Sequence, residues 1–401
     1  MKCLYSFQDG EFISRELIMS SLSDEVYQLL MVLSREGFQS LLIGGAVRDF
    51  VLTGKFSKDI DIELRHPFDH TEEEWAKLLT HLSRRLRDQY HYQVEELNFS
   101  VFRIHLNEVT VECASPRLEF YDGDGPWGHS EFRHQIGPKI PFEEAIHRRD
   151  FTINTMGIEH CTLGTDEEFK WRDPLRALLD FESGELKAAS DNFNKDPVRI
   201  LRAIRFSRRF NLELCPELLK KIAASNLSKL TPYYVESEAI KTGPFHFFSA
   251  LFELIDEFHI SIPDFMKDLR FLTQLDSYHE KPNSLLEYFY DLLLKTNVLI
   301  SEEVLEKFVS HFQFKSKLSK DAYQFLSFRL SSNPDEKKSV LIPVLKGHLL
   351  TQLELKQENE LVQKLRLAKQ DLRATQAKWK QDFKQYEEKF IEKTFQKFFE
   401  Q

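Results

Sequence analysis

The sequence predicts an α+β protein, in which a mixed sheet with helices is followed by an all-helical region. Residues from about 22 to 160 alternate short β-type apolar runs with helical segments. From Asp191 onward helical periodicity takes over and is interrupted at proline-containing turns. The stretch from Glu354 to Phe399 lacks Gly and Pro, and its apolar residues mostly step by three, four or seven, which predicts one long amphipathic helix.

The N-terminal elements are predicted in order along the chain. Ser23 can cap a helix that runs to about Glu36, because its hydroxyl accepts from the first free N–H groups. Helices are also expected at 46–52 and 71–87, and an apolar strand is expected after Asp150. The glycine-rich stretch 121–129 is interpreted as a mobile loop. Further strands are expected near 39–43, 59–64, 92–96, 99–105 and 109–114.

Composition limits the class of protein. A chain of 401 residues is long enough for two or three domains. Its net charge of −10 argues against a nonspecific nucleic-acid coat, although a local basic groove is compatible with it. Four dispersed cysteines suggest neither a disulfide framework nor a zinc site, and no apolar run reaches membrane-spanning length. We therefore expect a reduced cytoplasmic protein with no membrane partner.

Two neighbouring motifs point to nucleotide chemistry. An apolar run ends at Gly44 and Gly45, where backbone N–H groups at a helix start can approach phosphates. The next strand carries Asp59 and Asp61, whose side chains share one face and can bind divalent metal together. Each motif alone is common in a plain turn or at a solvated strand end. In this order they indicate Mg²⁺ and nucleotidyl transfer.

This arrangement resembles the polymerase-β-like nucleotidyltransferases, and within them the branch of tRNA nucleotidyltransferases and bacterial poly(A) polymerases. The family carries a third acid on a matching strand, five residues before an arginine, and Glu112 stands five residues before Arg117. The resemblance implies that Asp59 and Asp61 hold the metal ions and that Glu112 completes the site. Glu112 could instead face solvent on an edge strand.

The segment from Arg148 to Asn154 reads RRDFTIN, which is a motif of the same family. Adjacent arginines could form no more than a surface ion-pair cluster, but guanidinium groups also suit phosphate and ribose recognition. The resemblance implies that Arg149, Asp150 and Asn154 lie near the sugar and phosphates. It also implies that Gly44, Gly45 and Arg48 bind the triphosphate together with Arg149.

A third motif begins at Asp196 and continues into a helix that carries Arg199, Arg202 and Arg205 along one face. Such a stripe usually indicates phosphate or another acidic partner. The resemblance implies that Asp196 and Arg199 read the base edges of CTP and ATP, with Arg202 and Arg205 at the phosphates. The sequence departs from the family pattern at two positions, with Lys195 in place of a glutamate and Tyr234 in place of an arginine.

The resemblance covers roughly residues 40 to 240 and implies three parts. These are a catalytic head at 1–160, a neck with the base template at 161–245, and an RNA-binding body and tail at 246–401. The implied activity is Mg²⁺-dependent addition of CCA to the tRNA 3′ end from CTP and ATP, with protein partners unknown. The alternatives are a poly(A) polymerase, an enzyme that adds only CC or only A, and a noncatalytic RNA-binding protein with a relic nucleotide fold.

Overall fold

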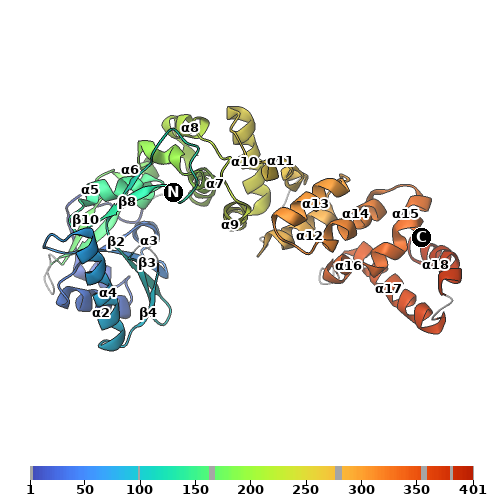
Figure 1. The fold of residues 1–401 in the computed structure, drawn as a ribbon, viewed down its shortest axis with the longest axis horizontal. Coiled ribbons are helices and arrows are strands. Elements are labelled where there is room, and N and C mark those ends of the chain that lie inside the picture. Colours follow the sequence, from blue (N-terminus) through green and yellow to red (C-terminus); the bar gives the residue numbers. More distant parts are fainter. Residues whose placement is uncertain are drawn as a thin grey trace. The chain divides into compact units, whose positions relative to one another are not determined.

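The computed structural model describes residues 3–97, 100–161, 168–275, 282–353, 359–379 and 383–400. The chain divides into two compact units, Met1–Lys229 and Leu230–Gln401. In the described part of the chain, the strands belong to the first unit and the second unit is helical (Figure 1). This confirms the predicted combination of a mixed sheet with an all-helical region.

The main sheet of the first unit has eight strands in the order β1-β10-β9-β2-β3-β6-β5-β4. β3 and β6 run parallel, whereas the other pairings in this sheet are antiparallel. Its strands are β1 (Phe12–Ile13), β2 (Gln39–Ile43), β3 (Asp59–Arg65), β4 (Gln93–Glu96), β5 (Phe102–His105), β6 (Thr110–Ala114), β9 (Gly157–His160) and β10 (Phe169–Arg172).

The five strands predicted from the sequence correspond to β2 through β6, although residue 99 of the fourth range lies outside the described residues. The sequence interpretation was wrong in ending the sheet near residue 160. β9 pairs with β2, and β10 and then β1 extend the same edge. These added strands are two to four residues long, which is too short for a clear alternation of apolar and polar residues.

Three helices of the first unit begin where the sequence predicts. α2 (Asp24–Arg35) is capped by the Ser23 hydroxyl, which accepts from the Val26 N–H. α3 (Gly45–Thr53) follows β2 directly, and α4 (Glu72–Asp88) begins with a capping box between Thr71 and Glu74. The other helices of this unit are α1 (Arg15–Met19), α5 (Phe142–Ala145), α6 (Ala177–Ser183), α7 (Val198–Phe210) and α8 (Pro216–Ala223), with 3₁₀ turns η1 (Ile146–Arg148), η2 (Thr152–Asn154) and η3 (Asp191–Lys195).

Two small sheets complete the first unit. β7 (Arg117–Phe120) and β8 (Arg133–Ile136) pair antiparallel, and they flank the glycine-rich segment. β11 (Glu185–Leu186) and β12 (Glu213–Leu214) pair in parallel on either side of α7 in the sequence.

The second unit consists of helices packed through aromatic and aliphatic side chains. The rings of Phe289 and Phe308 lie 4.8 Å apart, and Phe271 contacts both. Its helices are α9 (Pro232–Thr242), α10 (Pro244–Phe258), α11 (Asp264–Lys267), η4 (Arg270–Thr273), α12 (Leu285–Lys295), α13 (Glu302–His311), α14 (Lys317–Leu330), α15 (Pro334–Lys346), α16 (His348–Leu353), α17 (Glu360–Trp379) and α18 (Phe383–Phe398).

The prediction of one long C-terminal helix was wrong, because the chain forms the two helices α17 and α18. Lys397 Nζ lies 2.6 Å from Asp371 Oδ2. In one continuous helix these residues would be about 39 Å apart, so the chain must turn back between them. Residues 354–358 and 380–382 of the predicted helix lie outside the described residues. Apolar positions on both helices are buried, which explains why the apolar periodicity continues from one helix to the next.

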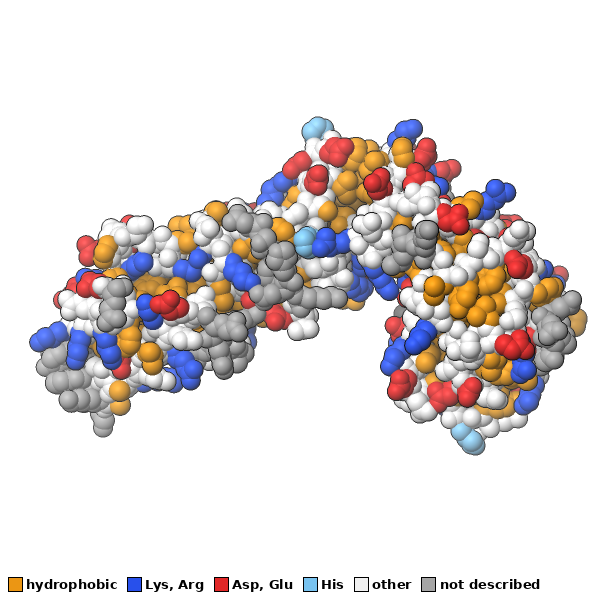
Figure 2. All heavy atoms as spheres, turned by 180° about the vertical axis from the view of Figure 1, so that it is seen from behind, with side chains coloured by type: hydrophobic (Ala, Val, Ile, Leu, Met, Phe, Trp, Pro, Cys, Tyr) orange, Lys and Arg blue, Asp and Glu red, His pale blue; other side chains and the backbone are white. Residues whose placement is uncertain are grey.

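Surface charge is mixed on each unit. On the face drawn in Figure 2, lysine and arginine side chains are interspersed with aspartate and glutamate side chains. None of the helices described has both the length and the apolar character that crossing a bilayer requires.

Candidate nucleotide site

Gly44 lies in the turn between β2 and α3, and its backbone conformation demands glycine. Its φ is +77° and its ψ is −135°, a combination that L side chains rarely adopt. A Cβ at this position would lie 2.7 Å from Arg149 Nη1 and 3.1 Å from Asp61 Oδ2. The structure therefore brings together one residue from each of three predicted motifs, namely the glycine turn, the aspartate strand and the arginine segment.

The two predicted metal ligands are exposed on the same face of β3. Asp59 and Asp61 alternate with the buried Ile60, as the two-residue period of a strand requires. Asp61 lies opposite Glu112 in the parallel pairing of β3 with β6. Glu112 also accepts a hydrogen bond of 3.1 Å from Arg103. Glu112 therefore lies next to the two aspartates, but its carboxylate is already hydrogen-bonded to Arg103.

The electrostatics of Asp61 reflect this crowding of acids. Desolvation by the surrounding protein raises the pKa of its carboxyl group, and the negative charges of Glu112 and Asp59 raise it further. Arg149 and Arg148 oppose that rise. Clustered carboxylate oxygens are the ligands that Mg²⁺ prefers, and a divalent cation would relieve their repulsion. Among the described residues, however, no three His, Cys, Asp or Glu side chains form a group that could hold a metal ion.

The segment after Arg149 forms a buried hydrogen-bond network. Asp150 Oδ1 accepts from the Phe151 N–H at 2.8 Å and from Asn154 Nδ2 at 2.9 Å. The expected strand at this point is instead the 3₁₀ turn η2, which brings Asn154 back over Asp150. Arg202 Nε donates to Asp150 Oδ2 at 2.6 Å, so this network connects the arginine segment to α7.

Arg48 is part of the same network and not of an open surface. It is only 4% exposed, and its Nη1 donates to Asn154 Oδ1 at 2.5 Å. Its guanidinium lies over the rings of Phe206 and Phe210, at 5.4 and 4.7 Å from their centroids. This position fixes α3 against α7. Its predicted contact with triphosphate stays a prediction.

A pocket of about 360 Å³ gathers five of the predicted nucleotide residues, Arg149, Asp150, Asp196, Arg199 and Arg202. The lining contains five arginines against three carboxylates, so the pocket favours an anionic ligand within an acidic chain. Gly44, Gly45, Arg48, Asn154 and Arg205 are not among the residues that line this pocket, nor are the three predicted catalytic acids. Arg205 lies over the Phe206 ring, 4.2 Å from its centroid.

The sequence interpretation missed the other residues of this lining: Arg117, Glu119, His129, Ser130, Phe132 and Arg148. Burial lowers the pKa of the Arg148 guanidinium to about 10, with the neighbouring Arg149 adding to the effect. Arg148 could have been chosen, since it stands beside Arg149 in the RRDFTIN motif. The remaining residues belong to the β7–β8 hairpin. In the sequence, Arg117 is notable only for its spacing from Glu112 and His129 only as part of the glycine-rich stretch, and no local pattern assigns these residues to a nucleotide site.

The predicted base readers lie at the start of α7. Arg199 donates to the backbone carbonyls of Asn192, at 3.0 Å, and Arg148, at 2.6 Å. Asp196 Oδ1 accepts from the Val198 N–H, and His129 Nδ1 lies 2.9 and 3.0 Å from its two carboxylate oxygens. Both side chains therefore line the pocket in fixed positions. In this structure their hydrogen-bonding partners are protein groups.

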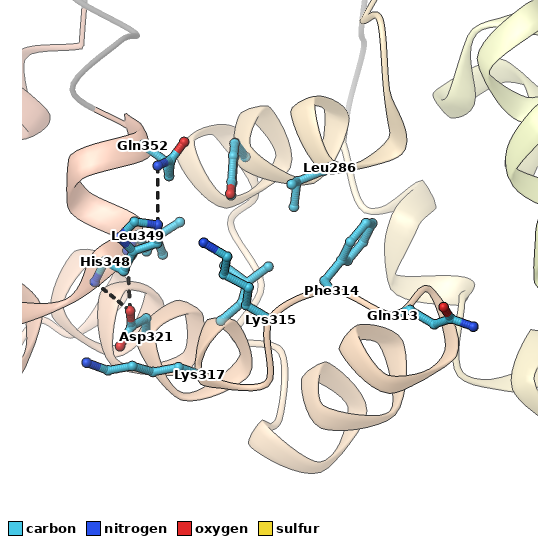
Figure 3. Close-up of a pocket in the computed structure, with 11 residues that line it drawn as sticks. Leu286, Gln313, Phe314, Lys315, Lys317, Asp321, His348, Leu349 and Gln352 are labelled. Atoms are coloured by element: carbon cyan, nitrogen blue, oxygen red, sulfur yellow. Dashed lines mark hydrogen bonds between the residues drawn. The ribbon is translucent and has the colours of Figure 1, made fainter.

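A larger pocket, of about 440 Å³, lies in the second unit among α12, α14 and α16 (Figure 3). Its lining is mainly apolar, and it contains none of the predicted site residues. Its carboxylate, Asp321, already accepts from the N–H groups of His348 and Leu349 at the start of α16. The residues predicted from the sequence to carry the chemistry therefore lie in the first unit.

Part of the sequence is similar to known proteins. Residues 40–187 match the family model described as the poly A polymerase head domain. Poly(A) polymerase I of Escherichia coli O157:H7 and that of Salmonella typhi are each 27% identical over 262 residues, which is 63% of this chain and 52% of each relative. The chain thus spans about half the length of the curated relatives it matches.

Solved structures show the same fold at low sequence identity. A CCA-adding enzyme in an apo form has a TM-score of 0.55 at 18% identity, covering 84% of this chain and 76% of that one. A tRNA nucleotidyltransferase in complex with a primer tRNA and an ATP analogue has a TM-score of 0.50 at 21% identity, covering 86% and 99%.

Residues 40–187 are thus similar to a poly A polymerase head domain, and the fold of the chain is similar to that of a solved CCA-adding enzyme. More particularly, the chain is similar in sequence to bacterial poly(A) polymerase I and similar in fold to CCA-adding enzymes.

Proposed function

We propose that this protein adds CCA to the 3′ end of tRNA from CTP and ATP without a nucleic-acid template. The observation that carries the proposal is the arginine-rich pocket, in which Asp196 and Arg199 lie beside Arg149, Asp150 and Arg202. A carboxylate can accept from the exocyclic amino group that cytosine and adenine share, and an arginine can donate to a ring nitrogen or carbonyl oxygen. Neighbouring arginines suit the phosphates of the same nucleotide.

The proposed reaction is an in-line attack of the tRNA 3′-hydroxyl oxygen on the α-phosphorus of the nucleotide. A new phosphodiester bond forms as the bond to the pyrophosphate leaving group breaks. Asp59 and Asp61 would hold Mg²⁺, which would stabilise charge on the attacking and leaving oxygens. Glu112 would complete the set only after giving up its hydrogen bond with Arg103. The backbone N–H groups at Gly44 and Gly45 would approach the triphosphate at the start of α3, and Arg149 lies directly beside Gly44.

The other predicted nucleotide residues have proposed roles at the sugar and at the phosphates. Asp150 and Asn154 are proposed to lie at the sugar, with Arg202 and Arg205 at the phosphates. Arg48 is buried, so it would act on the triphosphate indirectly, by holding α3 in place. The N-cap residue of α3 is Gly44, which has no side chain, so the free N–H groups at this helix start are not capped by a side chain. The partners are the tRNA 3′ end, CTP and ATP. The cytoplasmic location and the three-part division at residues 160 and 245 stay predictions.

A poly(A) polymerase is the second candidate, because curated relatives bear that name. The net charge of −10 favours a defined tRNA over arbitrary RNA 3′ ends, since nonspecific affinity for RNA comes from positive charge. The glycine-rich segment at 121–129 is the feature that favours complete CCA addition over partial addition.

The test uses tRNA transcripts that end before CCA, after C and after CC, each incubated with one labelled nucleoside triphosphate and Mg²⁺. The proposal expects two additions from CTP and then a single addition from ATP. Long adenylate products on any RNA 3′ end would identify a poly(A) polymerase, and arrest after CC or addition of A alone would identify a partial enzyme. The absence of any incorporation would favour the noncatalytic RNA-binding alternative. Asp61→Asn serves as the matched inactive protein.

A further inference from the structure

The segment between β7 and β8, residues 121–132, is attached to the template region by three contacts. We call it the β7–β8 loop. His129 Nδ1 lies 2.9 Å from Asp196 Oδ2. The Lys195 ammonium lies 5.6 Å from the centroid of the Tyr121 ring and 5.4 Å from that of Trp127. All of these residues belong to the first unit.

The third contact is at the far end of the loop, where Lys229 forms an ion pair with Glu131. Glu131 also accepts from the Gly128 N–H at 3.0 Å, which fixes the backbone just before His129. The loop is therefore held at its start by Lys195, at its middle by Asp196 and at its end by Lys229.

His129 contacts the carboxylate of Asp196, which is the group proposed to accept a hydrogen bond from the nucleobase. Asp196 has two oxygens, one of which also accepts from the Val198 N–H at 2.9 Å. His129 approaches both oxygens, and both residues line the arginine-rich pocket. A ligand that donates an amino hydrogen to Asp196 from within this pocket therefore competes with His129 for the carboxylate.

Lys195 contributes to the position of the loop through the Tyr121 and Trp127 rings. A cation is attracted by the face of an aromatic ring, and Trp and Tyr are the rings with the strongest attraction. The family signature that this sequence resembles has glutamate at this position, which would face the same rings with a negative charge. The departure from the pattern thus creates a contact that a glutamate could not make.

We propose that His129 and Lys195 form a latch that holds the β7–β8 loop over the pocket, and that a nucleotide gains Asp196 by displacing His129. This inference rests on the proposed function, because it takes the pocket as the nucleotide site. The latch lowers the apparent affinity for CTP and ATP, since only the unlatched fraction of the protein offers Asp196 to a base. His129 and Lys195 are positioning residues in this scheme.

The latch itself is tested without nucleotide, by hydrogen exchange at the amides of residues 121–132 in the full-length protein. His129→Ala and Lys195→Glu should each speed exchange in this loop several-fold compared with the wild type. Lys77→Met is the matched control, because Lys77 forms an exposed ion pair with Glu73 on α4, away from the loop. Unchanged loop exchange in both latch variants would overturn the proposal.

The second measurement is the equilibrium affinity for CTP and for ATP in the absence of RNA. His129→Ala should bind both nucleotides more tightly, by about threefold or more, because the competing donor is gone. His129→Gln should restore wild-type affinity, since its amide can donate to Asp196. Unchanged or weaker binding by His129→Ala would overturn the inference. If the wild type binds neither nucleotide, the proposed function fails, and the exchange experiment still decides whether the latch exists.

Discussion

Gly44 is the residue at which the backbone and the site constrain each other most closely. Its left-handed φ and the short distances to Arg149 and Asp61 leave no room for a side chain. Gly44→Ala should therefore misplace these two groups and reduce nucleotidyl transfer by roughly 10²-fold, since a displacement of about 1 Å can cost that much. It should also cost about 1–3 kcal/mol of unfolding free energy through backbone strain.

Gly184→Ala is the control for Gly44→Ala. Gly184 also has a positive φ, of +73°, but a Cβ there would meet nothing within 4 Å. Its loss of stability should be comparable and its rate of transfer should stay near that of the wild type. Chemical denaturation of both variants measures the backbone strain, and single-turnover kinetics measures the effect on nucleotidyl transfer. An equal loss of transfer in the two variants would contradict the assignment of Gly44 to the nucleotide site.

Asp150 links the stability of the first unit to pH. Burial favours its neutral form, but the charge of Arg202, hydrogen bonds from Asn154 and Phe151, and the charge of Arg199 together lower the pKa of the carboxyl group below its ordinary value. The unfolded chain therefore binds this proton more tightly. The resulting stabilisation is complete above the unfolded pKa of about 4 and is lost as the pH falls through the lower folded value.

Asp150→Asn should consequently lower the free energy of unfolding at pH 7 by about 1–3 kcal/mol, because buried hydrogen bonds to a charged carboxylate are lost while the half-exposed Arg202 remains solvated. The difference from the wild type should narrow as the pH falls below about 4. Denaturation at a series of pH values measures this. Glu108→Gln is the comparison, since Glu108 forms an exposed pair with Lys58 and should change stability little at any pH. A constant difference across pH would show that the charge of Asp150 is not responsible.

At the scale of elements, α7 connects the buried network to the pocket. Arg199 and Asp196 are three residues apart, and their side chains converge near its first turn. Arg199→Ala should lose about 1–3 kcal/mol of base discrimination, which raises incorporation of UTP and GTP relative to CTP and ATP roughly 5- to 150-fold. Asp196→Ala should act in the same direction.

The overall rate should also fall in Arg199→Ala, because this side chain donates to the carbonyls of Asn192 and Arg148. The ratio of nucleotides incorporated is therefore the informative measurement. Arg209→Ala, on the same helix but exposed and paired with Asp49, should leave that ratio unchanged. Lower rates with wild-type ratios in both pocket variants would mean that the pair is structural.

The elements also show what sequence reasoning could and could not reach. β2, α3 and β3 were predictable because strong apolar patterns and a Gly-Gly turn lie within a few residues of each other. The pocket residues of the β7–β8 hairpin were not predictable, because only the tertiary fold brings them to Asp196. His129, for example, lies 67 residues from Asp196 in the sequence. The division into α17 and α18 was missed because both helices bury apolar residues and the apolar spacing continues from one helix to the other.

At the scale of the whole molecule, charge is distributed unevenly. The chain has a net charge of −10, yet the pocket presents more arginines than carboxylates. Composition alone disfavours a nonspecific nucleic-acid coat, but it could not locate the local cationic pocket. That pocket depended on the spacing of three motifs in the sequence and on a fold that places them together.

Each unit has a core of its own, which has a consequence for unfolding. Leu30 is fully buried in the first unit, and Phe395 is 3% exposed in the second. Compact units with separate cores unfold as separate cooperative transitions when they stabilise each other little. We therefore expect two transitions in calorimetry or in denaturant.

The two transitions are assigned by one core substitution in each unit. Leu30→Ala should lower the stability of the first unit by about 2–5 kcal/mol, and Phe395→Ala that of the second by about 3–5 kcal/mol, through lost burial and the cavities that remain. Each should shift one transition and leave the other in place. Gln396→Ala, next to Phe395 but exposed, should shift neither. A single transition that both core substitutions move would show instead that the chain unfolds as one cooperative body.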